Sequence, residues 1–135
     1  MSDFLTANVK LDEKQYIFIN EYTEMLSTID EAFQYVISSF DDYEKTEGDT
    51  VLSDIFRAFA QIAESNDILK AIFNEEPSVT NAVDQYEEVT KQAMKMDGSF
   101  NDQNKKQVVV TESLYPAFKE WKEKVSKEMT IYIKN

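Results

Sequence analysis

The sequence has no cysteine and no histidine among its 135 residues. Without these residues the chain cannot form a Ser-His-Asp or Cys-His nucleophile, a thiol redox pair or a zinc site of the usual ligands. It also cannot carry the Glu-x-x-His pairs of di-iron four-helix proteins. Glu-x-x-Glu pairs are present, as at Glu21/Glu24, and could in principle hold Mg²⁺, but they lie off the expected core. We therefore predict a protein without a catalytic, cofactor or metal site.

Turn-forming residues and long apolar runs are also scarce. Gly48 and Gly98 are the only glycines, and Pro77 and Pro116 the only prolines, which is too few for a β-rich domain and favours long helices. No stretch is apolar and long enough to span a membrane, and the N-terminus lacks the apolar segment of a secretory signal. We expect a cytoplasmic protein with one domain over residues 1–135, of which residues 1–11 form an N-terminal arm.

What the sequence does contain is apolar residues at alternating three- and four-residue steps, the spacing of helices packed side by side. The first predicted helix begins at Asp12, where Gln15 completes a capping box, and continues to Tyr43, with Gly48 as its terminator. The second begins at Thr50 and ends before Pro77. Asn66 lies on its apolar stripe, which favours a kink there over a polar core position that fixes the register.

The third predicted helix is capped by Ser78 and ends at Gly98, and the fourth begins near Asn101 or Asp102. Pro116 interrupts the fourth segment, but the apolar stripe keeps its phase across it. We therefore expect one kinked helix or two short helices nearly in line. Short connections place successive helices antiparallel, so the predicted fold is all-α, an antiparallel up-down-up-down four-helix bundle with a kinked C-terminal helix.

Apolar residues gather at one end of this bundle in excess of what the four stripes need. Tyr16 and Ile17 belong to a run that is apolar all round, and Ile131 and Ile133 reach the same end in an antiparallel bundle. The N-terminal arm, with Phe4, Leu5 and Val9, could fold over this end. Alternatively, the end is a surface for a partner protein or for self-association into a homodimer.

Negative charge is concentrated in the first part of the chain. Residues 12–47 hold ten acidic and two basic residues, a balance of −8 within a net charge of −12. This distribution argues against direct binding of nucleic acid or membrane surfaces. The candidate acidic face of the first helix comprises Glu21, Glu24, Asp41 and Asp42.

These observations favour a non-enzymatic protein–protein interaction module of the adaptor, chaperone or regulator type. The alternative is an acidic mimic of nucleic acid that occupies the basic cleft of a partner protein. The segment Leu114-Tyr115-Pro116-Ala117-Phe118-Lys119-Glu120-Trp121-Lys122 resembles the C-terminal signature of a family of small uncharacterised helical proteins from Bacillus-type bacteria. The resemblance implies a bacterial or phage source and carries over no site residues.

Overall fold

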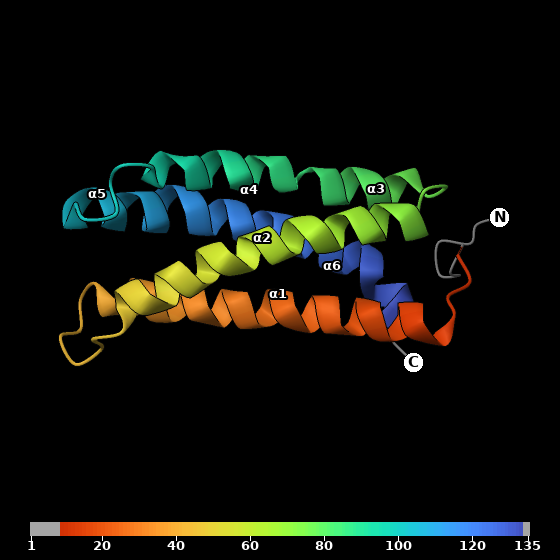
Figure 1. The fold of residues 1–135 in the computed structure, drawn as a ribbon, viewed down its shortest axis with the longest axis horizontal. Coiled ribbons are helices and arrows are strands. Elements are labelled where there is room, and N and C mark those ends of the chain that lie inside the picture. The colour runs from red at the N-terminus through yellow and green to blue at the C-terminus, as the bar shows by residue number, and fades with distance from the viewer. Residues whose placement is uncertain (1–8, 134–135) are drawn as a thin grey trace.

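The protein is an all-α structure of four helices packed against each other, as predicted. A computed structural model describes residues 9–133. Figure 1 shows each helical segment running in the direction opposite to the one before it, with the fourth lying beside the first. The elements are α1 (Glu13–Ser39), α2 (Gly48–Ile72), α3 (Pro77–Asp84), α4 (Tyr86–Ala93), the 3₁₀ turn η1 (Met94–Met96), α5 (Gln103–Val108), the π-helical segment η2 (Val109–Leu114) and α6 (Tyr115–Ile133).

Helix α1 begins as predicted and ends earlier. The Gln15 backbone N–H donates to the Asp12 side chain over 2.8 Å, and the Gln15 side chain accepts from the Asp12 backbone over 3.0 Å. The predicted extension to Tyr43 is wrong, because the helix ends at Ser39 and Tyr43 is fully exposed. The Asp42 side chain instead accepts from the Glu44 backbone and stabilises a turn.

Helix α2 begins two residues before the predicted Thr50, at Gly48, which therefore starts a helix rather than ending one. It continues through Asn66 without a break. Asn66 is buried, and the Tyr22 hydroxyl donates to its side-chain oxygen over 2.6 Å. Of the two interpretations of Asn66, the structure therefore has the buried polar position, within an unbroken helix.

The third predicted helix is divided at Gln85 into α3 and α4. The Trp121 indole N–H donates to the Ala82 carbonyl over 3.1 Å, and the Gln85 backbone N–H donates to the same oxygen over 3.2 Å. In a continuous helix this oxygen would accept from Tyr86. The predicted cap is also wrong, because Glu76 precedes the helix and Pro77 is its first residue.

Gly98 does end this region, with a φ of 75° that glycine adopts without strain. Asp102 then caps α5 by accepting from the Lys105 backbone over 3.1 Å. The predicted distortion near Pro116 is present as the π-helical segment η2, which ends two residues before the proline. Proline has no N–H to donate to the preceding turn, and a wider turn accommodates this loss.

The core is contiguous and rich in aromatic rings. Phe33 of α1 and Phe118 of α6 have ring centroids 5.3 Å apart, and both lie near Phe59 of α2. Tyr86 of α4 contacts Trp121 of α6 at 4.7 Å. Rings from all four helical segments therefore meet in one cluster. Among the helices of residues 9–133, none is both long and apolar enough to cross a membrane.

Candidate docking surfaces

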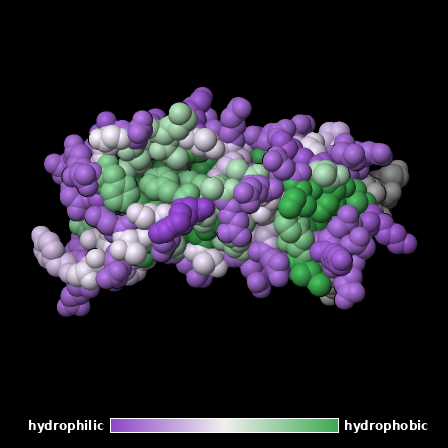
Figure 2. Space-filling model, in the orientation of Figure 1, coloured by the Kyte–Doolittle hydropathy of each residue, from purple (hydrophilic) through white to green (hydrophobic). Residues whose placement is uncertain are grey.

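The predicted apolar end is partly exposed. Tyr16 and Ile17 of α1 are 36% and 47% exposed, and Ile68 of α2 is 49% exposed. Ile131 and Ile133 are half-buried and pack against the core. Figure 2 shows strongly apolar side chains at the end of the molecule where α1 begins and α2 ends.

The predicted arm falls largely outside the described residues. Val9 and Leu11 are half-buried and pack against the core, whereas Phe4 and Leu5 lie outside residues 9–133. The role of the apolar end in binding a partner stays a prediction.

The candidate acidic face is divided between two elements. Glu21 and Glu24 are exposed on α1, but Asp41 and Asp42 lie in the connection after it, because the helix ends at Ser39. Asp42 also forms an ion pair with Lys45 at 3.0 Å. The four residues therefore do not share one helix face, and their binding role also stays a prediction.

Asp30, a further acidic residue of α1, is held by α6. It accepts from the Tyr115 hydroxyl over 2.6 Å and forms an ion pair with Lys122 at 3.4 Å. Burial acts to raise the pKa of Asp30, but the hydrogen bonds from Tyr115 and Gln34 and the charge of Lys122 outweigh it, so this pKa lies below its usual range. Burial and the bond to Asp30 raise the pKa of Tyr115 to about 12. Asp30 is therefore a structural contact rather than an exposed charge.

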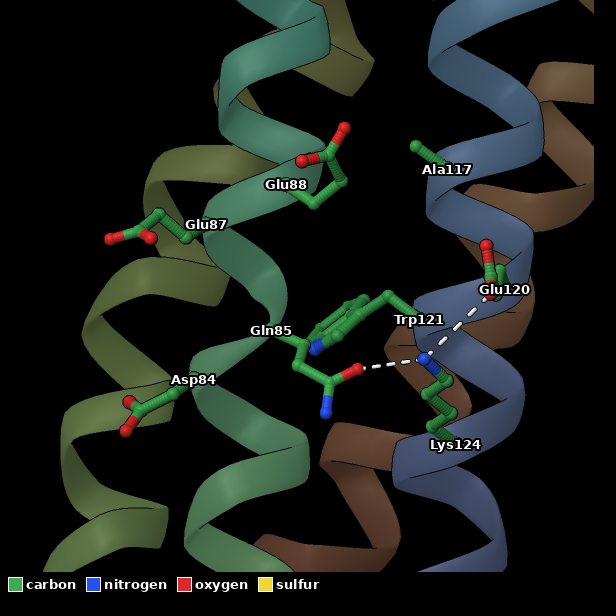
Figure 3. Close-up of a pocket in the computed structure, with 8 residues that line it drawn as sticks. All are labelled: Asp84, Gln85, Glu87, Glu88, Ala117, Glu120, Trp121 and Lys124. Carbon is green, nitrogen blue, oxygen red and sulfur yellow. Dashed lines mark hydrogen bonds and ion pairs between the residues drawn. The ribbon is translucent and has the colours of Figure 1, made fainter.

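A polar hollow lies where the third segment divides. It has a volume of about 370 Å³ and is walled by α4 and α6 around Gln85, Trp121 and Lys124. Figure 3 shows Lys124 pointing toward Gln85 and Glu120, with N···O distances of 2.8 and 3.7 Å. Gln85, Glu120 and Lys124 are thus engaged with each other, and the Trp121 indole N–H already donates to the Ala82 carbonyl.

A second hollow, between α2 and α4, is apolar. We call it the α2–α4 groove; it has a volume of about 360 Å³. Met94, at the end of α4, is 70% exposed beside it. Figure 2 shows this patch as a pale green area between the two helices. The groove is lined by Phe56, Phe59, Ala60 and Ala63 of α2 and by Tyr86, Thr90, Ala93 and Met94 of α4 and η1.

The groove is open because α4 packs on α6 and η2. Of the two helices α3 and α4, it is α3 that packs closely on α2. The first residue of α4 remains attached to α2, since the Tyr86 hydroxyl donates to the Phe59 carbonyl over 3.0 Å. Burial raises the pKa of this tyrosine, so it stays neutral. Tyr86 therefore fixes the position of α4 against α2 beside the groove.

The sequence contains a second apolar row in α2 that was not included in the predicted core stripes and that indicates this groove. Phe56, Ala60 and Ala63 follow one another at steps of four and three residues, beside the core stripe of α2. Such a second apolar row indicates a second packing partner for the helix. Which surface covers it cannot be read from the row alone, because α4 could have filled the same space.

Comparison with known proteins places the chain in a family. The family described as a domain of unknown function (DUF8042) matches residues 17–124. The protein therefore belongs to this family, and its own structure is all-α with four packed helices. Neither the curated proteins nor the solved structures include a match to the chain. Among residues 9–133, no three acidic side chains gather in an arrangement that could hold a metal ion.

Proposed function

We propose that this protein acts without catalysis, by contact with another protein, as an adaptor, chaperone or regulator in the cytoplasm of a bacterium. The observation that carries the proposal is the α2–α4 groove, where Phe56 is half-buried and Ala60, Ala63 and Met94 are exposed. Contiguous apolar surface of this kind is typical of protein contacts, because water solvates it poorly.

The test is quantitative affinity capture from the native host, with proteins identified by mass spectrometry. Wild-type protein is compared with Ala60→Glu, which places a charge in the groove. The matched control is Gln61→Glu, one residue further on and also exposed. We expect a stoichiometric protein partner for the wild type and for the control. Capture of no protein in stoichiometric amount by the wild type would contradict the proposal.

The acidic mimic remains the second candidate, supported by the net charge of −12 and by exposed carboxylates such as Glu21 and Glu24. Ionic strength separates the two functions. A mimic that occupies a basic cleft should lose most of its affinity between about 50 and 500 mM salt, because its attraction is screened. Apolar docking should change little over the same range.

A further inference from the structure

An acidic hollow adjoins the α2–α4 groove. This second hollow, of about 200 Å³, shares Ala63 and Tyr86 with the groove and extends toward α3. The two hollows therefore lie next to each other along α2. We call them together the channel, which is apolar on the side of Phe56 and Met94 and polar on the other side. A ligand that filled both would have to change from apolar to polar along its length.

The polar section carries net negative charge. Asp67, Asp84 and Glu87 line it together with Lys70, three acidic groups against one basic group and a balance of −2. Lys70 is already paired with Asp84 at 2.9 Å. All three acidic residues are exposed, so they can meet a cation without a large desolvation cost.

Two further cations, one on α2 and one on α4, are also engaged. Arg57 of α2 is paired with Asp54 at 2.8 Å, and Lys91 of α4 lies 3.7 Å from Glu88. The channel is therefore an apolar groove that ends in negative charge, on a chain whose net charge is −12. This pattern complements a basic partner and disfavours a second copy of the same chain.

The shape of the channel favours a helix as its occupant. Its walls are two helices, and the small side chains of Ala60 and Ala63 leave space beside the bulkier Phe56 and Tyr86. An amphipathic helix fills such a groove with apolar side chains at helical spacing. Met94 is unbranched and flexible, and it can adapt to the side chains that enter.

We propose that the channel binds an amphipathic helix of a partner protein, with apolar side chains in the α2–α4 groove and basic residues over Asp67, Asp84 and Glu87. This inference rests on the proposed function and adds the chemistry of the partner and its orientation. The basic end of the bound helix lies toward α3, and its apolar part lies toward the end of α4.

The first test uses a fluorescent synthetic peptide of about 18 residues, roughly 27 Å as a helix. It has leucines at helical spacing and lysines at one end. The control is a scrambled peptide of the same composition. Binding to the full chain is measured by anisotropy. We expect the ordered peptide to bind and the scrambled peptide to bind at least about tenfold more weakly. Equal binding of both peptides would overturn the inference, because charge alone would then explain it.

Two protein variants locate the binding. Ala60→Glu should weaken peptide binding about tenfold, although it adds a negative charge that would attract a basic peptide elsewhere. Gln61→Glu adds the same charge outside the groove lining and should leave affinity unchanged or slightly raised. Equal affinities for the two variants would overturn the inference. Both residues are exposed, so the thermal unfolding midpoint of each variant should stay close to that of the wild type.

A second pair of variants tests the orientation. The double variant Asp67→Asn/Glu87→Gln should bind the basic peptide about threefold more weakly at low ionic strength. The charge-matched control Glu21→Gln/Glu24→Gln, on α1, should lose less affinity for the peptide. Equal losses would overturn the assignment of the acidic section.

Two other occupants are outcomes of the same experiments. Sedimentation that shows a wild-type dimer and a monomeric Ala60→Glu variant would assign the groove to a second copy. Marked tightening of peptide binding on removal of residues 1–8 would assign it to the chain's own N-terminus. Either result overturns the inference. A native partner whose capture is unaffected by Ala60→Glu would reject this site while leaving the proposed function in place.

Discussion

The Tyr22 hydroxyl donates a hydrogen bond of 2.6 Å to the side-chain oxygen of Asn66, joining α1 to α2 inside the core. Asn66 is 6% exposed, and it is flanked along α2 by the buried residues Ile62 and Leu69. A buried amide is tolerated there because its oxygen has a donor. The pair also ties one turn of α1 to one turn of α2, since a shifted helix would leave the amide oxygen without a partner.

Substitution of one member of this pair should cost more than substitution of both. Tyr22→Phe leaves the amide oxygen of Asn66 buried without its donor and should destabilise the protein by about 1–3 kcal/mol. Tyr22→Phe/Asn66→Leu removes both polar groups and should regain most of that loss. Urea unfolding measures both values. Tyr43→Phe, at a fully exposed tyrosine, is the control and should have no effect. Additive losses in the double variant would contradict the role given to the pair.

The contact between Asp30 and Tyr115 predicts a loss of stability in acid. Because the pKa of Asp30 is lower in the folded state than its ordinary value, the contact contributes fully above the unfolded pKa of about 3.9. Its contribution is lost as the pH falls through the folded pKa. Asp30→Asn should therefore flatten the dependence of unfolding free energy on pH below about pH 4.

The matched control for this prediction is Asp42→Asn. The hydrogen bond from Lys45 also lowers the pKa of Asp42, but that pair lies at the surface and is screened by water. Its removal should change the acid limb of the curve less. An acid limb unchanged by Asp30→Asn would show that other carboxylates dominate acid unfolding.

Burial of the Lys106 ammonium should be compatible with a stable fold only while Asp49 is its ion-pair partner. Its side chain is 2% exposed, and its ammonium lies 2.6 Å from Asp49 and 4.6 Å from the centre of the Phe100 ring. Asp49→Ala removes the carboxylate partner and should cost about 1–3 kcal/mol. Asp49→Ala/Lys106→Met replaces the lysine with an apolar chain and should restore stability. Thermal unfolding compares the two variants, and a double variant less stable than Asp49→Ala would contradict this interpretation.

The π-helical segment η2 predicts an unusual tolerance to deletion. A π turn bonds residues five apart instead of four, so removal of the exposed Thr111 can convert it to an α turn while both flanking helices keep their buried faces. Deletion of Glu123, exposed in the regular part of α6, should rotate Val125 and Met129 out of the core and prevent stable folding. Circular dichroism with thermal unfolding distinguishes the two. A Thr111 deletion as damaging as that of Glu123 would contradict the prediction.

The segment that carries the sequence resemblance has a structural role at several of its positions. Phe118 lies in the aromatic core, Trp121 donates to the Ala82 carbonyl, and Lys122 pairs with Asp30. These contacts join α6 to α1 and α3. The motif is therefore explained by packing of the bundle, and it does not need to mark a binding site.

Local chemistry made much of the fold predictable from the sequence. The capping box at Asp12 and Gln15 depends on residues three apart, and the apolar steps of α1 and α2 depend on residues within one or two turns. The end of α1 was harder to predict, because Phe40 keeps the apolar step while the Asp42 turn has already replaced the helix. The candidate residues of the apolar end and acidic face could be placed on a surface, but not assigned to a partner.

The amino-acid sequence by itself determined that this chain forms four amphipathic helical segments, since periodicity and caps act over a few residues. Only the tertiary structure decided where the third segment divides, because the bond from Trp121 to Ala82 joins positions 39 residues apart. It also decided that the α2–α4 groove stays open. Helix α4 packs against α6 and η2 rather than against the apolar row of α2. Phe56, Ala60 and Ala63 therefore line an open groove.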